Sequence, residues 1–245
     1  MTTMMQTKSI LTFFILTALL LAISASPSRA DDYTIVGVPR FNFTDGTNNV
    51  AGKAFVVQWF RGRTILLAPI HLLGPSGGCP IQMTADDIRN KVRSVDMLDL
   101  NGGEVIATAE KSLLSDGATV SKRNGENGLD LVAFEVRGSS RATKLGICAT
   151  PVAVGTKAWV LTHTDGSSST RCDRYPGTVS SSDAVDLAIR LDRPLDAHGS
   201  SGSPVVDAKG QLIGMMVGVE DDERKVSVCV PATAIYQTLY KAAGQ

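Results

Sequence analysis

The sequence predicts an all-β fold of the sandwich or barrel type, and three observations support that prediction. Short apolar runs that are rich in β-branched residues recur along most of the chain. Clusters of Gly, Asn and Asp separate these runs, as tight turns require. The runs do not alternate with long helical patterns, so a parallel sheet built from βαβ units is not expected.

The first half of the chain is expected to be all-β. Arg61 and Gly62 separate its first two apolar runs and indicate a hairpin. The expected strands of this half are residues 54–60, 63–67, 93–98, 104–109, 118–121 and 131–136.

A short polar stretch, residues 138–144, has the composition of a crossing between two structural units. Pro231 begins the only convincing amphipathic helix expected in the mature chain, because Ala234, Ile235, Leu239 and Ala242 recur at roughly helical spacing. The expected strands of the second half are residues 157–162, 177–180, 185–191, 205–207, 211–219 and 226–230.

The N-terminal residues 1–30 have the pattern of a secretory signal peptide. Lys8 precedes an uncharged apolar run over residues 10–23, and small residues stand at cleavage spacing up to Ala30. An N-terminal membrane anchor is the alternative, but the run is shorter than the about 20 residues that a span needs. We therefore expect cleavage after Ala30 and export of the chain to the periplasm or the extracellular space.

Charge and cysteine content narrow the class further. Lys and Arg number 24 and Asp and Glu number 24, so no nucleic-acid or anionic-membrane partner is indicated. In an exported chain, Cys79, Cys148, Cys172 and Cys229 could pair into disulfide bonds. Cys229 lies in the middle of an expected strand and could equally be a buried free thiol.

Residues 197–207 contain the candidate nucleophile, Ser201. Gly199 lacks a Cβ, so its N–H group could converge with that of Ser201 on a developing oxyanion. Gly202 lets the chain turn away behind the hydroxyl, and Pro204 stiffens the entry to a strand. An ordinary Gly/Ser turn between two strands is the alternative interpretation.

A nucleophilic serine needs a base and a carboxylate that orients it. The chain has 3 histidines, His71, His163 and His198, and none follows Ser201, which excludes an α/β-hydrolase. No two of them stand at zinc-ligand spacing, so we expect no metal or other cofactor.

His71 follows an expected strand and is the candidate base, although a histidine that merely caps a turn is the alternative. Asp130 stands at the head of an apolar strand, where a lone acid needs a partner. Asp99 is the competing carboxylate, but the Asn-Gly-Gly sequence after it suggests a solvated hairpin end.

These residues resemble the chymotrypsin-like, or trypsin-like, serine protease family. Residues 67–71 are similar to that family's Leu-Thr-Ala-Ala-His, residues 130–133 to its Asp-Ile-Ala-Leu, and residues 199–204 to its Gly-Asp-Ser-Gly-Gly-Pro. The order His71, Asp130, Ser201 is also the family's order. The Ser-Gly-Ser-Pro ending is closest to secreted bacterial members such as the glutamyl endopeptidases.

The resemblance implies two six-stranded β-barrels with a cleft between them and a C-terminal α-helix. The first barrel, residues 31–140, would supply His71 and Asp130. The second barrel and the helix, residues 141–245, would supply Ser201 and an oxyanion hole formed by the N–H groups of Gly199 and Ser201.

The sequence departs from the family at several places. Ala68, Pro69 and Ile70 replace small residues before the histidine, so the turn at His71 could be set differently. Ser200 replaces the aspartate that binds a new N-terminal amine in animal enzymes. We therefore expect residues 35–37 to be an ordinary first strand and predict no activation through that salt bridge.

Specificity residues also differ from a simple trypsin. Leu195 stands at the position that decides basic specificity. Asp196 and His198 could recognise a charged side chain or belong to a solvated loop. Met215, Met216 and Val217 are expected to form an apolar wall beside the substrate.

The expected activity is that of a secreted serine endopeptidase that forms an acyl-enzyme intermediate on Ser201. Its expected partner is a polypeptide substrate, and the mature chain is expected to be a monomer without a membrane span. A catalytically silent barrel that binds ligands, and an esterase that uses the same triad, are the alternatives.

Overall fold

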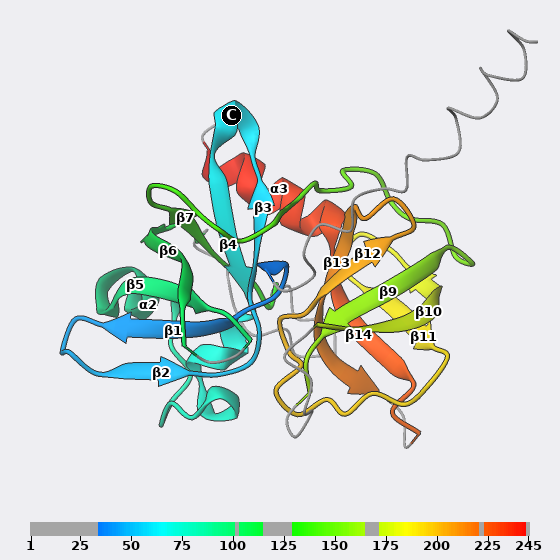
Figure 1. The fold of residues 1–245 in the computed structure, drawn as a ribbon, viewed down its shortest axis with the longest axis horizontal. Coiled ribbons are helices and arrows are strands. Elements are labelled where there is room, and N and C mark those ends of the chain that lie inside the picture. The colour runs from blue at the N-terminus through cyan, green and yellow to red at the C-terminus, as the bar shows by residue number, and fades with distance from the viewer. Residues whose placement is uncertain (1–33, 101–102, 115–128, 165–171, 221–222, 244–245) are drawn as a thin grey trace, which may run out of the picture. The chain divides into compact units, whose positions relative to one another are not determined.

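The described part of the chain folds mainly into strands, which form an eight-stranded sheet and a closed barrel (Figure 1). The computed structural model describes residues 34–100, 103–114, 129–164, 172–220 and 223–243. These residues belong to the compact unit Asp32–Gln245, which is described by itself. The expected signal peptide, residues 1–30, and the expected strand 118–121 lie outside the described residues.

The first half of the unit forms the eight-stranded sheet. Its strands follow the order β2-β1-β5-β6-β7-β4-β3-β8, and all neighbours are antiparallel except β3 and β8. The strands are β1 (Val38–Phe43), β2 (Asn48–Val50), β3 (Phe55–Gln58), β4 (Thr64–Ala68), β5 (Val92–Leu98), β6 (Val105–Ser112), β7 (Val132–Val136) and β8 (Lys144–Leu145).

This sheet differs from the six-stranded first barrel that the resemblance implies. Short strands β2 and β8 extend its two edges, and β8 joins β3 in the one parallel pairing. A single antiparallel bridge joins Gly37 and Ala54, the residues just before β1 and β3. The bridge does not continue as a ladder because β1 then pairs with β2 and β5.

The second half forms the closed six-stranded barrel β10-β11-β14-β13-β12-β9, so the prediction of a barrel here is confirmed. Alternate side chains of these strands fill its interior, including those of Ile189, Val205 and Met216. The strands are β9 (Lys157–Thr162), β10 (Asp173–Ser182), β11 (Leu187–Leu191), β12 (Pro204–Asp207), β13 (Leu212–Glu220) and β14 (Val226–Pro231).

The predicted C-terminal helix is present as α3 (Ala232–Ala242), and Pro231 is its N-cap. Its buried residues Ile235 and Leu239 pack into an apolar cluster that also contains residues of the sheet and of the barrel. Phe55 and Leu67 contribute from the sheet, and Met215 and Val230 from the barrel. The sheet and the barrel therefore share one core, which α3 helps to fill.

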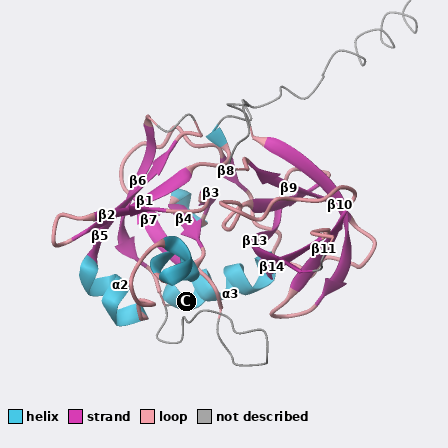
Figure 2. Ribbon diagram, turned by 90° about the horizontal axis from the view of Figure 1, so that it is seen from below, coloured by secondary structure: helices cyan, strands magenta, loops and turns pink. Residues whose placement is uncertain are grey.

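A short helix that the sequence reading did not predict, α2 (Ala85–Lys91), contacts β5 (Figure 2). Thr84 and Asp87 form a capping box at its start. Single turns of 3-10 helix also occur, as η2 (Phe60–Gly62), η3 (Ile70–Leu73) and η4 (Pro75–Gly77). Across the described ranges, no helix has the length and apolar character of a membrane span.

The disulfide bonds that the sequence allows are not formed within the described ranges, which include all four cysteines. Cys79, Cys172 and Cys229 belong to three different apolar clusters, so their sulfur atoms are held in separate parts of the core. Cys148 is only partly buried. The alternative of a buried free thiol at Cys229 is therefore the one that the structure contains.

Candidate active site

His71 and Asp130 are brought together by the pairing of β4 with β7. Strand β4 ends at Ala68, Pro69 breaks it, and His71 lies in the 3-10 turn η3 that follows. Ala68 pairs with Val132, so His71, just after the end of β4, and Asp130, just before the start of β7, become neighbours. The unusual residues before His71 therefore still deliver it to a turn after the strand, as predicted.

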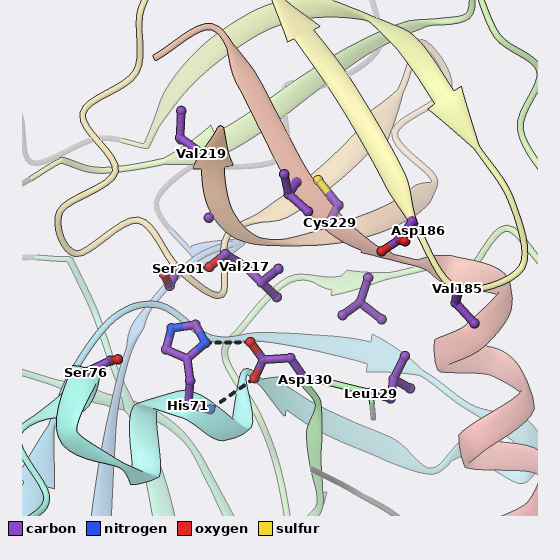
Figure 3. Close-up of a pocket in the computed structure, with 13 residues that line it drawn as sticks. His71, Ser76, Leu129, Asp130, Val185, Asp186, Ser201, Val217, Val219 and Cys229 are labelled. Carbon is purple, nitrogen blue, oxygen red and sulfur yellow. Dashed lines mark hydrogen bonds and ion pairs between the residues drawn. The ribbon is translucent and has the colours of Figure 1, made fainter. Parts of the chain in front are cut away.

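The Asp130 carboxylate holds His71 at two points (Figure 3). Its Oδ2 atom lies 2.6 Å from Nδ1 of the ring, and its Oδ1 atom accepts the main-chain N–H of His71 at 3.0 Å. Asp130 is only 4 % exposed, so these bonds replace the water that the carboxylate loses. With Nδ1 donating to Asp130, Nε2 of His71 is left as a proton acceptor.

Ser201 lies on the loop that enters β12 and lines the same cavity as His71 and Asp130 (Figure 3). The volume of this cavity is about 510 Å³. The Ser201 hydroxyl donates to the carbonyl oxygen of Val217 at 3.3 Å. The structure thus places the three predicted catalytic residues at one cavity, with the serine hydroxyl bonded to main chain and not to the imidazole.

The loop around Ser201 uses most of its main-chain groups in hydrogen bonds. Ser200 N–H donates to the Ala197 oxygen at 3.0 Å, and Ser203 N–H donates to the Ser200 oxygen at 3.1 Å. Gly202 N–H donates to the Met216 oxygen at 2.8 Å. Within the described residues, the N–H groups of Gly199 and Ser201 have no such partner, so both remain available as donors at the predicted oxyanion position.

Two glycines of this loop occupy left-handed backbone conformations, Gly199 with φ 67° and Gly202 with φ 97°. At Gly202 the backbone of Lys53 also approaches closely, because a Cβ there would stand 1.9 Å from the Lys53 carbonyl oxygen. Residues with side chains are disfavoured in this conformation. The Gly202 position therefore needs glycine for two separate reasons.

The cavity at Ser201 has polar and apolar walls of similar extent. Val217, which was predicted to contact substrate, lines it, and so does the Asp186 carboxylate. The further apolar lining residues are Leu129, Val185, Val219, Val228 and Val230.

A second cavity of about 210 Å³ lies on the loop side of Ser201, where His198 and Gly199 line it together with Gly52 and Leu72. Neither Leu195 nor Asp196 is among the residues that line these two cavities.

Several specificity predictions need correction. Leu195 is 0 % exposed and packs inside the barrel. Asp196 is exposed and pairs with Arg224 at 3.5 Å, which favours the solvated-loop alternative. Met215 and Met216 are both 0 % exposed, so they do not form a wall beside substrate; they point into two different apolar clusters because neighbouring residues of β13 face opposite sides.

Asp99 and Ser200 both lie in local hydrogen bonds away from the His71 ring. Asp99, the competing carboxylate, accepts the N–H of Gly103 at 3.2 Å on an exposed turn. Ser200 is buried, and its hydroxyl donates to the Asp196 oxygen at 2.9 Å. The expectation of a first strand at residues 35–37 is wrong: residues 35 and 36 lie in a turn and a bend, Gly37 forms an isolated bridge to Ala54, and the first strand begins at Val38.

Several residues at the site were not predicted from the sequence, because the fold brings them there from distant segments of the chain. Val185 and Asp186 come from the β10–β11 turn, and Cys229 comes from β14. Lys53 was also missed, although it contacts the Ser201 loop through both main chain and side chain. A lysine between Gly52 and the apolar run of residues 54–57 is the only sequence signal that could have indicated it.

A trypsin-like peptidase domain model matches residues 71–215, more than half of the chain. The chain belongs to the trypsin-like peptidase family. The matched range of the peptidase domain begins at His71 and includes Asp130 and Ser201. No curated protein sequence matches the chain.

Solved structures of the Rv3671c protease from M. tuberculosis share the fold of this peptidase domain. Its active form matches with a TM-score of 0.54 and 15% identity, covering 86% of this chain and 82% of that chain. Its inactive form matches with a TM-score of 0.54 and 15% identity, and the match covers 86% of this chain and 90% of that chain. The inactive form of a serine-to-alanine mutant from strain H37Rv matches with a TM-score of 0.51 and 15% identity, and the match covers 85% of this chain and 87% of that chain.

Proposed function

We propose that this chain is an exported serine endopeptidase in which His71, Asp130 and Ser201 form the catalytic triad. The observation that carries the proposal is the double hydrogen bond from His71 to the buried Asp130 carboxylate, at the cavity that Ser201 also lines. A carboxylate that fixes the ring from the Nδ1 side leaves Nε2 to act as a base toward the serine. Membership in the trypsin-like peptidase family supports the same assignment.

Acylation would begin with rotation of the Ser201 hydroxyl from the Val217 oxygen toward Nε2 of His71. Oγ attacks the scissile carbonyl carbon as Nε2 takes its proton, and the carbonyl oxygen becomes an oxyanion. Asp130 stabilises the imidazolium that forms. The N–H groups of Gly199 and Ser201 would bind the oxyanion, each contributing about 3 kcal/mol to lowering the barrier.

The tetrahedral intermediate would collapse when His71 donates its proton to the leaving amine, which breaks the C–N bond and leaves an ester on Ser201. A water molecule then attacks the ester carbonyl while Nε2 takes one of its protons. The second intermediate releases the carboxylic acid, and the proton returns from His71 to Oγ of Ser201. The cycle consumes one water molecule and restores the starting state.

The larger cavity suggests which peptides would be cleaved. Its lining by Val217, Val219 and Val228 favours apolar side chains, because burying these surfaces against one another removes both from water. We therefore propose a preference for apolar residues beside the cleaved bond. The Asp186 carboxylate at the same cavity adds one acceptor for a polar or cationic group.

An esterase that uses the same residues and a silent binding protein are the competing functions. The fold does not distinguish either of these functions from that of a peptidase, since both would retain the His71–Asp130 pair. The silent alternative gains its only support from the Ser201 hydroxyl, which is bonded to Val217 and not to His71.

Cleavage profiling of a peptide library by the mature chain, residues 31–245, tests the proposal. We expect cleavage at defined bonds that are enriched in apolar residues, and we expect Ser201→Ala to lose it. Equal loss of amide and ester hydrolysis in Ser201→Ala would identify the triad as the source of both. Hydrolysis of simple esters with no peptide cleavage would favour the esterase, and a folded chain with neither activity would favour the binding protein.

A further inference from the structure

Lys53 is a buried lysine whose side chain ends at the loop that carries Ser201. It lies between β2 and β3 and is only 4 % exposed. Its Nζ atom donates to the carbonyl oxygen of Gly199 at 2.7 Å. Lysine is almost never fully buried without a partner, because burial costs the hydration of its charge. The position of this ammonium group therefore needs a specific explanation.

The main chain of Lys53 contacts the same loop on the other side of Ser201. Its N–H group donates to the Ser201 oxygen at 2.7 Å. Its carbonyl oxygen lies against Gly202, where a Cβ would come within 1.9 Å. One residue of the first half thus contacts the loop of the second half both before and after the candidate nucleophile.

These contacts fix two peptide groups of the loop. The peptide between Gly199 and Ser200 is bonded at both ends, because Lys53 Nζ binds its oxygen and the Ala197 oxygen accepts its N–H. The peptide between Ser201 and Gly202 is also bonded at both ends, to the Lys53 N–H and the Met216 oxygen. Over the described residues 199–203, the main-chain N–H groups without a partner are those of Gly199 and Ser201.

The flexible backbone at Gly199 needs a restraint, which the Lys53 side chain supplies. Glycine adopts many backbone conformations at low cost, so the peptide groups that flank it rotate readily unless they are bonded. Ser200 supplies no carboxylate for anchoring this loop, and its hydroxyl bonds only locally, to the Asp196 oxygen. The ammonium group of Lys53 provides a charge-assisted bond that restrains the Gly199 oxygen.

We propose that Lys53 is a positioning residue that holds the Gly199 carbonyl so that the N–H groups of Gly199 and Ser201 stay aimed at the oxyanion position. The catalytic role of Lys53 rests on the proposed peptidase function, whereas its restraint of the loop rests only on its contacts. Both can be measured on the same variants.

The test compares Lys53→Met with the parent mature chain, because methionine keeps the main-chain N–H and nearly the same side-chain length but removes the ammonium donor. Lys157→Met is the matched control, since Lys157 is an exposed lysine whose Nζ bonds Thr178 away from the loop. Amide hydrogen exchange of residues 197–203 is measured by mass spectrometry, and kcat and KM are measured on a peptide that the parent cleaves. The inhibition constant of a peptide trifluoromethyl ketone is also measured, because this inhibitor forms an oxyanion when the serine attacks it.

In Lys53→Met we expect about tenfold faster exchange in residues 197–203, about tenfold lower kcat with KM within about twofold, and a matching rise in the inhibition constant. Lys157→Met should change none of these. Unchanged exchange in folded Lys53→Met would overturn the proposal whether or not the parent is active. Faster exchange with unchanged kcat would overturn the catalytic part and leave the peptidase assignment standing.

An inactive parent would count against the peptidase function and not against the restraint of the loop, which exchange reports independently. If Lys53→Met does not fold, Lys53→Gln is measured instead, because its neutral amide tolerates a buried polar site better. The same rise in exchange is then expected, since the shorter glutamine side chain does not reach the Gly199 oxygen as the lysine does.

Discussion

Asp130 binds His71 through both of its carboxylate oxygens, one to Nδ1 of the ring at 2.6 Å and one to the main-chain N–H at 3.0 Å. The ring and the turn that carries it are therefore held by the same buried group. This arrangement exists because β4 and β7 are antiparallel neighbours and both residues lie at the same end of that pair. The bond to the main chain means that Asp130 also has a structural role at η3.

Replacement of Asp130 by asparagine should lower kcat by about 10³-fold or more, with a smaller effect on KM. An asparagine amide that donates to Nδ1 would place the proton of the imidazole on Nε2, which could then no longer accept from Ser201. The measurement is steady-state cleavage of a peptide that the parent cleaves. Asp99→Asn is the control, because the Asp99 carboxylate bonds only its own exposed turn among the described contacts; an equal loss in both variants would contradict the assignment.

Substitution of Gly202 by alanine should destabilise the fold by about 3 kcal/mol or more, because the new Cβ would collide with the Lys53 carbonyl and strain a positive φ. Urea denaturation measures the change in the free energy of unfolding. Gly210→Ala separates the two causes, since Gly210 has φ 76° and open space where a Cβ would stand. It should cost only about 1 kcal/mol. Equal costs would show that the contact with Lys53 does not constrain the loop.

Local sequence signals predicted the elements that depend on nearby residues. Pro231 and the apolar residues at helical spacing located α3. The apolar strand ahead of His71 located β4 and the turn after it. The helix α2 was not predicted from the sequence because it spans only 7 residues, too few to show a helical period of apolar residues. Its capping box was nevertheless visible as Thr84 and Asp87.

Residues that depend on distant parts of the chain could not be predicted in the same way. Leu195 and Met216 were expected at the substrate, but barrel closure turns both side chains into the interior. The inward orientation of Met216 depends on the register of β13, which a run of apolar residues does not define, and Leu195 lies outside any strand, on the loop between β11 and β12. Lys53 was missed for the same reason, since its partner Gly199 is distant in sequence and becomes a neighbour only in the folded unit.

The stability of the fold should depend on Asp96 in a pH-dependent way. Burial alone would raise the pKa of Asp96, but hydrogen bonds from Arg40, Asn42 and Thr108 together hold it below the ordinary value of 3.8. A carboxyl with a lowered pKa stabilises the folded state above its unfolded pKa, and this contribution is lost as pH falls through the folded pKa.

Asp96→Asn should therefore be less stable than the parent by about 1 kcal/mol near pH 7, after allowance for solvent screening. The difference should shrink as pH falls below the ordinary value of 3.8. Urea denaturation at several pH values measures it. Glu110→Gln, which breaks the exposed pair with Arg137, should change stability little. A stability difference for Asp96→Asn that does not vary with pH would contradict this account.

The four thiols should differ in their reactivity. Burial raises the pKa of Cys229 to about 12 and also raises the pKa of Cys79, so neither forms a thiolate readily at neutral pH. Iodoacetamide should therefore modify the partly buried Cys148 first, and should reach Cys79 and Cys229 only after unfolding. Peptide mapping by mass spectrometry without reduction reads the result. A disulfide bond, or rapid modification of Cys229 in the folded chain, would contradict the observed packing.

The central claim is that Ser201 is a nucleophile activated by His71 and Asp130, and a fluorophosphonate probe tests it most directly. The mature chain is treated with the probe, digested, and the modified residue is located by mass spectrometry, with His71→Ala and Ser201→Ala as controls. The account predicts a covalent adduct on Ser201 in the parent, a greatly slowed reaction in His71→Ala, and no adduct at this position in Ser201→Ala. A folded parent chain whose Ser201 stays unmodified, or whose adduct forms equally fast without His71, would contradict it.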